Sequence, residues 1–289
     1  MYGAMLHYYF FKDVVEKLDK SIKSELDYDD NLIFNLANFN TSPQFYKIFN
    51  PFKHDKYNIQ NYFDKDDCNS IIVESAINIQ KENDFNKLLF LYGMIAHKTL
   101  NDYLYPYVNA LKSNTYSFND ALNMLDFYSA KRNGLDITKE SIYKIFKDSF
   151  EYYDYMDEVI RWPMIKICKL MSSSTYFTKC YKRKRKFYKK YAKVKYRIVW
   201  IKFISVFYRK HSLSPKEFIY RKKVDTNLLN VKKVEFKIGE NIYNDNLDEL
   251  INKALKETLN NIKAVNSYLF DDNDKKLRQI YNIPQTKKL

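Results

Sequence analysis

A long apolar segment, residues 85–111, limits the fold more than any other part of the sequence. Its middle, from Leu88 to Ala96, would be apolar on every side of a helix and not only along one stripe. A helix of that kind is buried all round, so the segment predicts a central core helix. Pro106 should bend or end this helix, because proline cannot donate the hydrogen bond that continues it.

The rest of the chain predicts an all-α fold, a multi-helix bundle around this central helix. The 289 residues include only 4 Gly and 6 Pro, fewer than a turn-rich β fold needs. A stripe with a spacing of four residues predicts an opening helix, and it consists of Leu6, Phe10, Val14, Leu18 and Ile22. Alternation of Val234, Phe236 and Ile238 permits one short strand or hairpin.

Two capping patterns predict where further helices begin. Ser117 and Asp120 favour a helix that runs to about Arg132, with Gly134 closing it. Asn246 and Glu249 favour the start of the last long helix.

The cysteines and the length of the apolar runs indicate the cellular compartment of the protein. The three cysteines are widely spaced and form no C-x-x-C pair, which fits a reducing compartment. The opening residues do not have the pattern of a signal peptide, and no run is long enough for a spanning helix. We therefore expect a cytoplasmic protein, with contact to the membrane surface as a further option.

One segment makes the protein basic. Residues 160–216 contain no Asp or Glu and hold 18 of the 49 Lys and Arg, so the chain's net charge of +14 would be −4 without them. Aromatic and aliphatic residues recur at helical spacing from Phe187 to Tyr208, with cations on another face, which predicts a basic amphipathic helix. Its candidate anion-binding residues are Lys182, Arg183, Lys184, Arg185, Lys186, Lys189, Lys190, Lys193, Arg197 and Trp200.

Four uses of this segment remain open at the level of sequence. It could lie on an anionic membrane, grip a nucleic-acid backbone or dock an acidic partner. It could also be an ordinary helix with a solvated lysine face.

The central helix carries a motif. His97, Asn101 and Tyr105 follow one another at a spacing of four, which puts them on one helix face. A His-x3-Asp-x3-His array in that place would present three zinc ligands. The segment from Leu91 to Tyr107 resembles the central helix of the zinc-dependent phospholipase C family, with two ligands exchanged.

Other segments resemble the same family in the same order. They are Met5–Phe10 with His7 at a ligand position, Leu125–Tyr128 with Asn133–Asp136, Tyr220–Asp225 with Leu229 and Asn230, and Asp248–Leu250 through Tyr268. The resemblance covers about residues 1–158 and 217–270 and is closest to small intracellular bacterial members. It implies a helical domain whose zinc cluster would polarise a phosphodiester and generate hydroxide.

Most ligand positions implied by the resemblance hold residues that bind zinc poorly or not at all. The replaced positions are Gln44, Asn101, Tyr105, Phe118 and Leu122. Asn101 stands where a bridging carboxylate would be needed, and a neutral amide cannot neutralise two cations. His7 and His97 remain as imidazoles, with Asp66 as a substitute ligand. The alternative for Asp66 is a solvated helix start. Asp126 is expected to be a structural residue and could be a surface carboxylate.

These observations predict a catalytically degenerate phospholipase C homologue that binds phospholipid or membrane surfaces and holds no cofactor. One alternative is a hydrolase with a single residual zinc ion on His7, His97 and Asp66. The other is a nucleic-acid-binding protein that works through residues 179–210. The sequence does not indicate a substrate or an oligomeric state.

The expected organisation has four parts. A phospholipase C-like helical core occupies residues 1–158, and a basic amphipathic helical insertion follows at 159–216. Helices at 217–270 complete the core, and a polar tail occupies 271–289.

Overall fold

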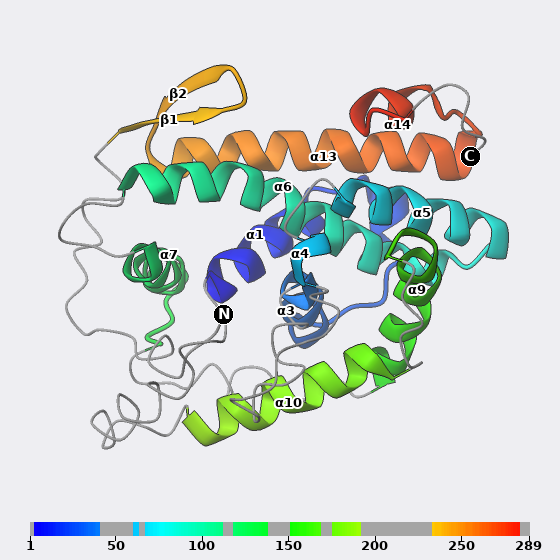
Figure 1. The fold of residues 1–289 in the computed structure, drawn as a ribbon, viewed down its shortest axis with the longest axis horizontal. Coiled ribbons are helices and arrows are strands. Elements are labelled where there is room, and N and C mark those ends of the chain that lie inside the picture. The colour runs from blue at the N-terminus through cyan, green and yellow to red at the C-terminus, as the bar shows by residue number, and fades with distance from the viewer. Residues whose placement is uncertain are drawn as a thin grey trace.

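A computed structural model describes residues 3–40, 60–63, 67–111, 118–137, 151–168, 175–191 and 233–283. These residues are mostly helical, as predicted, with one small antiparallel hairpin (Figure 1). The helices are α1 (Ala4–Glu16), α2 (Lys20–Lys23), α3 (Asp30–Ala37), α4 (Gln60–Phe63), α5 (Asp67–Glu82), α6 (Leu88–Leu111), α7 (Phe118–Arg132), α9 (Glu151–Cys168), α10 (Tyr176–Tyr191), α13 (Leu247–Asp271) and α14 (Lys275–Ile280). Strands β1 (Val234–Ile238) and β2 (Asn241–Asp245) form the hairpin.

Helix α6 is the central core helix that its apolar sequence predicts. A short 3-10 turn, Phe85–Lys87, leads into it, and every residue from Leu88 to Ala96 is buried. Helices α1, α3, α5 and α13 all pack against it. Of the two effects expected of Pro106, a bend or an end, the end does not occur, because α6 continues through this proline to Leu111, where the predicted segment also ends.

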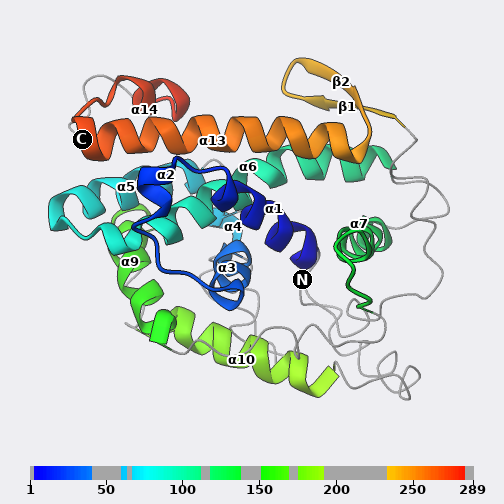
Figure 2. The same cartoon turned by 180° about the vertical axis from the view of Figure 1, so that it is seen from behind.

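Helix α13 runs alongside α6 in both views (Figures 1 and 2). It begins with the predicted capping box, in which the Asn246 side chain accepts from the backbone N–H of Glu249. The Glu249 carboxylate in turn accepts from the N–H of Asn246. Its buried face includes Leu247, Leu250 and Leu255, so this long helix closes one side of the core.

The hairpin confirms the predicted strand. β1 pairs with β2 in antiparallel register, from Val234 opposite Asp245 to Ile238 opposite Asn241. Gly239 has a φ of +57°, and this position in the two-residue turn favours glycine. Phe236 packs its ring edge-on against Tyr107 of α6, which fixes the hairpin on the core helix.

Two predicted boundaries need correction at the ends of the chain. The opening stripe does not form one helix, because α1 ends at Glu16 and Ile22 belongs to α2. The predicted polar tail contains α14, whose Leu277 is fully buried as α14 packs against α13. Tyr281 and Ile283 also pack against the core, so several apolar side chains hold this segment in place.

The predicted boundary between residues 158 and 159 lies inside α9. This helix buries Val159, Ile160 and Met164 and packs against α5, so it joins the start of the basic segment to the core. Of the basic segment, the structure describes only 160–168 and 175–191. The candidate residues Lys193, Arg197 and Trp200 lie outside the described residues. Among the helices in the described ranges, none has both the length and the hydropathy that a membrane crossing requires.

Candidate functional site

The candidate site lies where four helices meet. Helix α1 contributes His7, α6 contributes His97 and Asn101, the end of α3 contributes backbone carbonyls, and α10 contributes Lys184. All four of these side chains are buried.

His7 and His97 stack on each other, and we call them the imidazole pair. Their ring centroids are 4.2 Å apart and their planes differ by 27°. The side chains are 4% and 3% exposed, so water reaches neither ring freely. The structure thus brings together the two histidines that the sequence singled out, which are far apart along the chain.

Each imidazole donates its Nδ1 proton to a backbone carbonyl. His7 Nδ1 lies 2.6 Å from the Gly3 oxygen, and His97 Nδ1 lies 2.7 Å from the Ala37 oxygen. Because a carbonyl can only accept, the proton of a neutral ring sits on Nδ1 and leaves a lone pair on Nε2. This tautomer is typical of histidines that bind metal through Nε2.

Both rings are held in the neutral form. Burial lowers the pKa of His7. Burial lowers the pKa of His97 further, and the neighbouring His7 and the Lys184 ammonium add to that effect. A second positive charge in this cluster would therefore be costly.

Asn101 occupies the lone pair of His7. Its side-chain amide lies 2.9 Å from His7 Nε2, one helical turn after His97. The nearer amide atom is assigned as oxygen, but the amide oxygen and nitrogen exchange by a 180° rotation of the side chain. Since a neutral Nε2 accepts, the amide donates its NH2 group there, and this lone pair is already used.

The close approach of α3 to α6 positions the Ala37 carbonyl. Gly93 lies one turn before His97, and a Cβ built there would be 3.1 Å from Leu36 Cβ and 3.2 Å from the Leu36 oxygen. Only a glycine leaves the end of α3 this much room. The next carbonyl along, that of Ala37, then reaches His97 Nδ1.

Lys184 is the main correction to the sequence analysis. It was expected on the anion-binding surface, but its side chain enters the core and donates a 3.1 Å hydrogen bond to the Asn38 oxygen. Burial lowers the pKa of this ammonium to about 7. Among the described residues, Asn38 is its one hydrogen-bond acceptor, although an ammonium has three donors.

Lys184 points inward because of the phase of its helix. Phe177, Cys180, Tyr181 and Lys184 are spaced i, i+3, i+4 and i+7, and all are buried. Phe177 stacks on Phe39, just past the end of α3. That contact fixes the rotation of α10 and directs Lys184 toward the same stretch of backbone. The spacing was present in the sequence and could have revealed it.

Asp126 is the second correction, since it is fully buried and not on the surface. Its carboxylate accepts from the backbone N–H groups of Ala4, Met5 and Leu6, at 2.8 to 3.2 Å. It thus caps the start of the helix that carries His7. Burial raises the pKa of Asp126 to about 6, although the three N–H donors oppose that shift.

The residues present do not fit a cluster of zinc ions. At the other ligand positions, Leu122 is buried hydrocarbon and Tyr105 is 36% exposed. Gln44, Asp66 and the side chain of Phe118 lie outside the described residues. Within the part of the chain that the structure describes, no group of three or more His, Cys, Asp or Glu could hold a metal ion. Asp126 is committed to backbone donors and does not supply a bridging carboxylate.

The outer face of α10 carries the exposed cations. Lys179, Lys182 and Lys186 are exposed, and Arg183 is half-buried. At about 100° per residue the three lysines fall within roughly 60° of one another, opposite the buried aromatic face. We call these three lysines the cationic stripe. The side chains of Arg185, Lys189 and Lys190 belong to α10 but lie outside the described residues.

Comparisons of this chain with protein-family models, with curated proteins and with solved structures gave no match.

Proposed function

We propose that this protein is a metal-free relative of the zinc-dependent phospholipases C that binds anionic phospholipid surfaces through the outer face of α10. The resemblance of the central helix and of the segments around it supports the link to that family. The donor set around the imidazole pair supports a metal-free core, because His7 Nε2 is engaged by Asn101 and the nearby Lys184 ammonium repels further cations.

The observation that carries the proposal is the two-faced packing of α10. Phe177, Cys180 and Tyr181 anchor one face in the core, which leaves the cationic stripe on the opposite face. Asp157 of α9 accepts from the backbone N–H groups of Phe177 and Thr178 and holds the start of this helix. A cationic surface on a fixed helix suits a phosphate-rich plane.

The charge around the stripe favours the same partner. The surrounding segment, residues 160–216, contains no acidic residue that would neutralise the surface from within. Each cation near an anionic bilayer contributes about 1 kcal/mol, so three exposed lysines amount to roughly a hundredfold in affinity.

Sedimentation with vesicles tests the proposal. The full chain is mixed with phosphatidylcholine vesicles that contain either no phosphatidylserine or about a third of it, at low and high salt. We expect binding only with phosphatidylserine, weakened by salt. The triple variant Lys179→Glu, Lys182→Glu, Lys186→Glu should bind at least about a hundredfold more weakly.

The matched control has the same charge change on the opposite side of the molecule. It carries Lys256→Glu, Lys263→Glu and Lys276→Glu, three exposed lysines of α13 and α14, which lie away from α10 in both views (Figures 1 and 2). This variant should bind vesicles like the parent chain. Equal losses in both variants, or no vesicle binding together with a steep salt dependence on random DNA or RNA, would overturn the proposal.

A further inference from the structure

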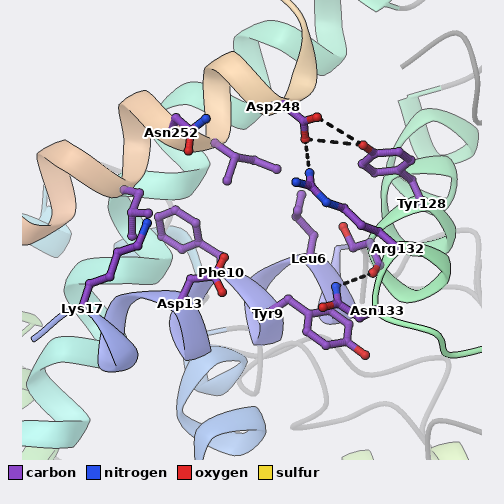
Figure 3. A pocket seen from close by; sticks show the side chains of 13 residues that line it. Leu6, Tyr9, Phe10, Asp13, Lys17, Tyr128, Arg132, Asn133, Asp248 and Asn252 are labelled. Atoms are coloured by element: carbon purple, nitrogen blue, oxygen red, sulfur yellow. Dashed lines mark hydrogen bonds and ion pairs between the residues drawn. The ribbon is translucent and has the colours of Figure 1, made fainter. Parts of the chain in front are cut away.

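A cavity of about 300 Å³ lies between α1, α7 and α13, apart from the imidazole pair (Figure 3). Its floor is apolar and consists of Leu6, Phe10, Ile251 and Leu255. Leu6, Phe10 and Leu255 are buried, so the floor belongs to the core and is rigid. The volume is at the lower end of the range for ligand pockets, roughly 300 Å³, which suits a ligand no larger than an amino acid.

One end of the cavity is closed by groups that satisfy one another. Arg132 donates to the Asp248 carboxylate, and the Tyr128 hydroxyl donates to the same carboxylate at 3.4 Å (Figure 3). The Asn133 amide donates to the Ser129 carbonyl at 2.8 Å. These contacts shape the wall and leave little there for a ligand to bind.

The wall formed by α1 differs, because its two charges form no direct hydrogen bond or ion pair within the described residues. Asp13 and Lys17 both line the cavity and both are exposed at its rim. Among the residues that the structure describes, no hydrogen bond or ion pair joins the side chain of either one to another residue. Lys12, the cation next to Asp13 in sequence, pairs with Asp30 instead. Partial loss of water raises the pKa of Asp13 although its side chain is still exposed, and the nearby charges of Lys17, Arg132 and Lys12 act against that shift.

We propose that this cavity binds a small zwitterion of the α-amino-acid type with an apolar side chain. The geometry behind the proposal is one carboxylate and one ammonium a helical turn apart, beside an apolar floor, neither in a direct hydrogen bond or ion pair among the described residues. The ligand's ammonium group pairs with Asp13 and its carboxylate with Lys17. Its side chain lies on the Phe10 and Leu255 floor, and the Asn252 amide at the rim adds a polar contact.

Three ligands that share one hydrocarbon body test this assignment by calorimetric titration of the full chain. They are L-phenylalanine, 2-phenylethylamine, which lacks the carboxylate, and 3-phenylpropanoate, which lacks the ammonium. L-Phenylalanine should bind saturably, and each analogue should bind roughly two- to fivefold more weakly, the range expected for one exposed ion pair.

Variants then locate the two charges. Asp13→Asn should weaken L-phenylalanine and the amine but not the acid, and Lys17→Met should weaken L-phenylalanine and the acid but not the amine. Asp19→Asn and Lys20→Met are the matched controls, because both residues are exposed a short way along the chain and line no part of the cavity. Asn252→Phe should block the cavity and abolish binding of all three ligands.

Three results would overturn the proposal. They are the absence of saturable binding by L-phenylalanine, equal affinity for the three ligands, and binding that Asn252→Phe leaves unchanged. None of these outcomes depends on vesicle binding, so the proposal for this cavity and the proposal for the outer face of α10 are tested independently.

Discussion

Lys184 is the residue on which the electrostatics of the core depends. Its ammonium is removed from water, has one hydrogen-bonded carbonyl among the described residues, and lies close enough to His97 to lower the pKa of that ring. A buried charge with so few partners costs free energy of folding that packing must offset. Beside two imidazoles with lowered pKa values, it is the group of this cluster that gains a positive charge as pH falls through about 7.

Lys184→Met should therefore stabilise the protein at pH 7, by about 1–4 kcal/mol, because an apolar side chain of similar length avoids the desolvation penalty. The pKa of Lys184 is about 7 in the folded state against 10.5 for an ordinary lysine. The unfolded chain thus binds more protons between these values, and the penalty is full below about pH 7 and fades as pH rises toward 10.5.

Urea unfolding at pH 7 and pH 10 measures this effect, with Lys179→Met on the exposed face of the same helix as control. The advantage of Lys184→Met should shrink at pH 10, and Lys179→Met should stay within about 0.5 kcal/mol of the parent. A Lys184→Met variant that is clearly less stable at pH 7 would mean that the ammonium is a net stabilising group.

Asp126 carries a second prediction. Asp126→Ala should cost about 2–4 kcal/mol, because three backbone N–H groups at the start of α1 lose their acceptor in the core. Asp29→Ala removes an exposed cap that serves one N–H of α3, and it should cost only about 1 kcal/mol. Urea unfolding at pH 7 compares the two. Equal costs would show that burial of the α1 cap contributes nothing.

The pH dependence of Asp126 has a definite sign. Its folded pKa of about 6 is above the ordinary 3.8, so the folded state holds the proton more tightly. The proton-linked part of its stability, which is separate from the three hydrogen bonds, is full below about pH 3.8 and is lost as pH rises through about 6. Asp126→Asn should remove that part of the pH dependence, and unfolding curves between pH 4 and 7 would detect the change.

The sequence predicted the position of those elements that have one strong local signal. The apolar run of α6, the capping box of α13 and the alternation of β1 each depend on neighbouring residues, and each is found in the structure. Pro106 does not end α6, one of its two expected effects, because packing around the helix outweighs the local preference. The burial of Lys184 is missed when this lysine is grouped with the cations beside it, although its spacing of four from Cys180 and three from Tyr181 puts it on the buried face.

The contact between α3 and α6 gives a prediction at this scale. Glycine to alanine inside a helix usually stabilises by about 0.5–1 kcal/mol. Gly93→Ala should instead destabilise by about 1–3 kcal/mol, because the new methyl meets Leu36 at 3.1 Å and pushes α3 from α6. Denaturant unfolding decides the sign, and a more stable Gly93→Ala variant would contradict the close packing that aims Ala37 at His97.

For the molecule as a whole, the sequence predicted a helical bundle around one central helix and singled out the two histidines that meet. It missed that Lys184 and Asp126 are buried, since tertiary packing decides which polar side chains the core admits. A lysine or an aspartate is ordinarily assigned to the surface. Its burial becomes predictable only when its position around the helix is compared with the positions of the apolar residues on the same helix. The charge asymmetry of residues 160–216 was visible in the sequence, but only the fold indicates which lysines face outward.

The central claim is that too few free electron pairs remain around the imidazole pair to hold neighbouring zinc ions. Zinc analysis of the purified chain, after expression with added zinc and gel filtration, tests it most directly. We predict substantially less than one tightly held zinc ion per chain. Two or more zinc ions per chain, together with phosphodiesterase activity that a chelator removes, would contradict the account.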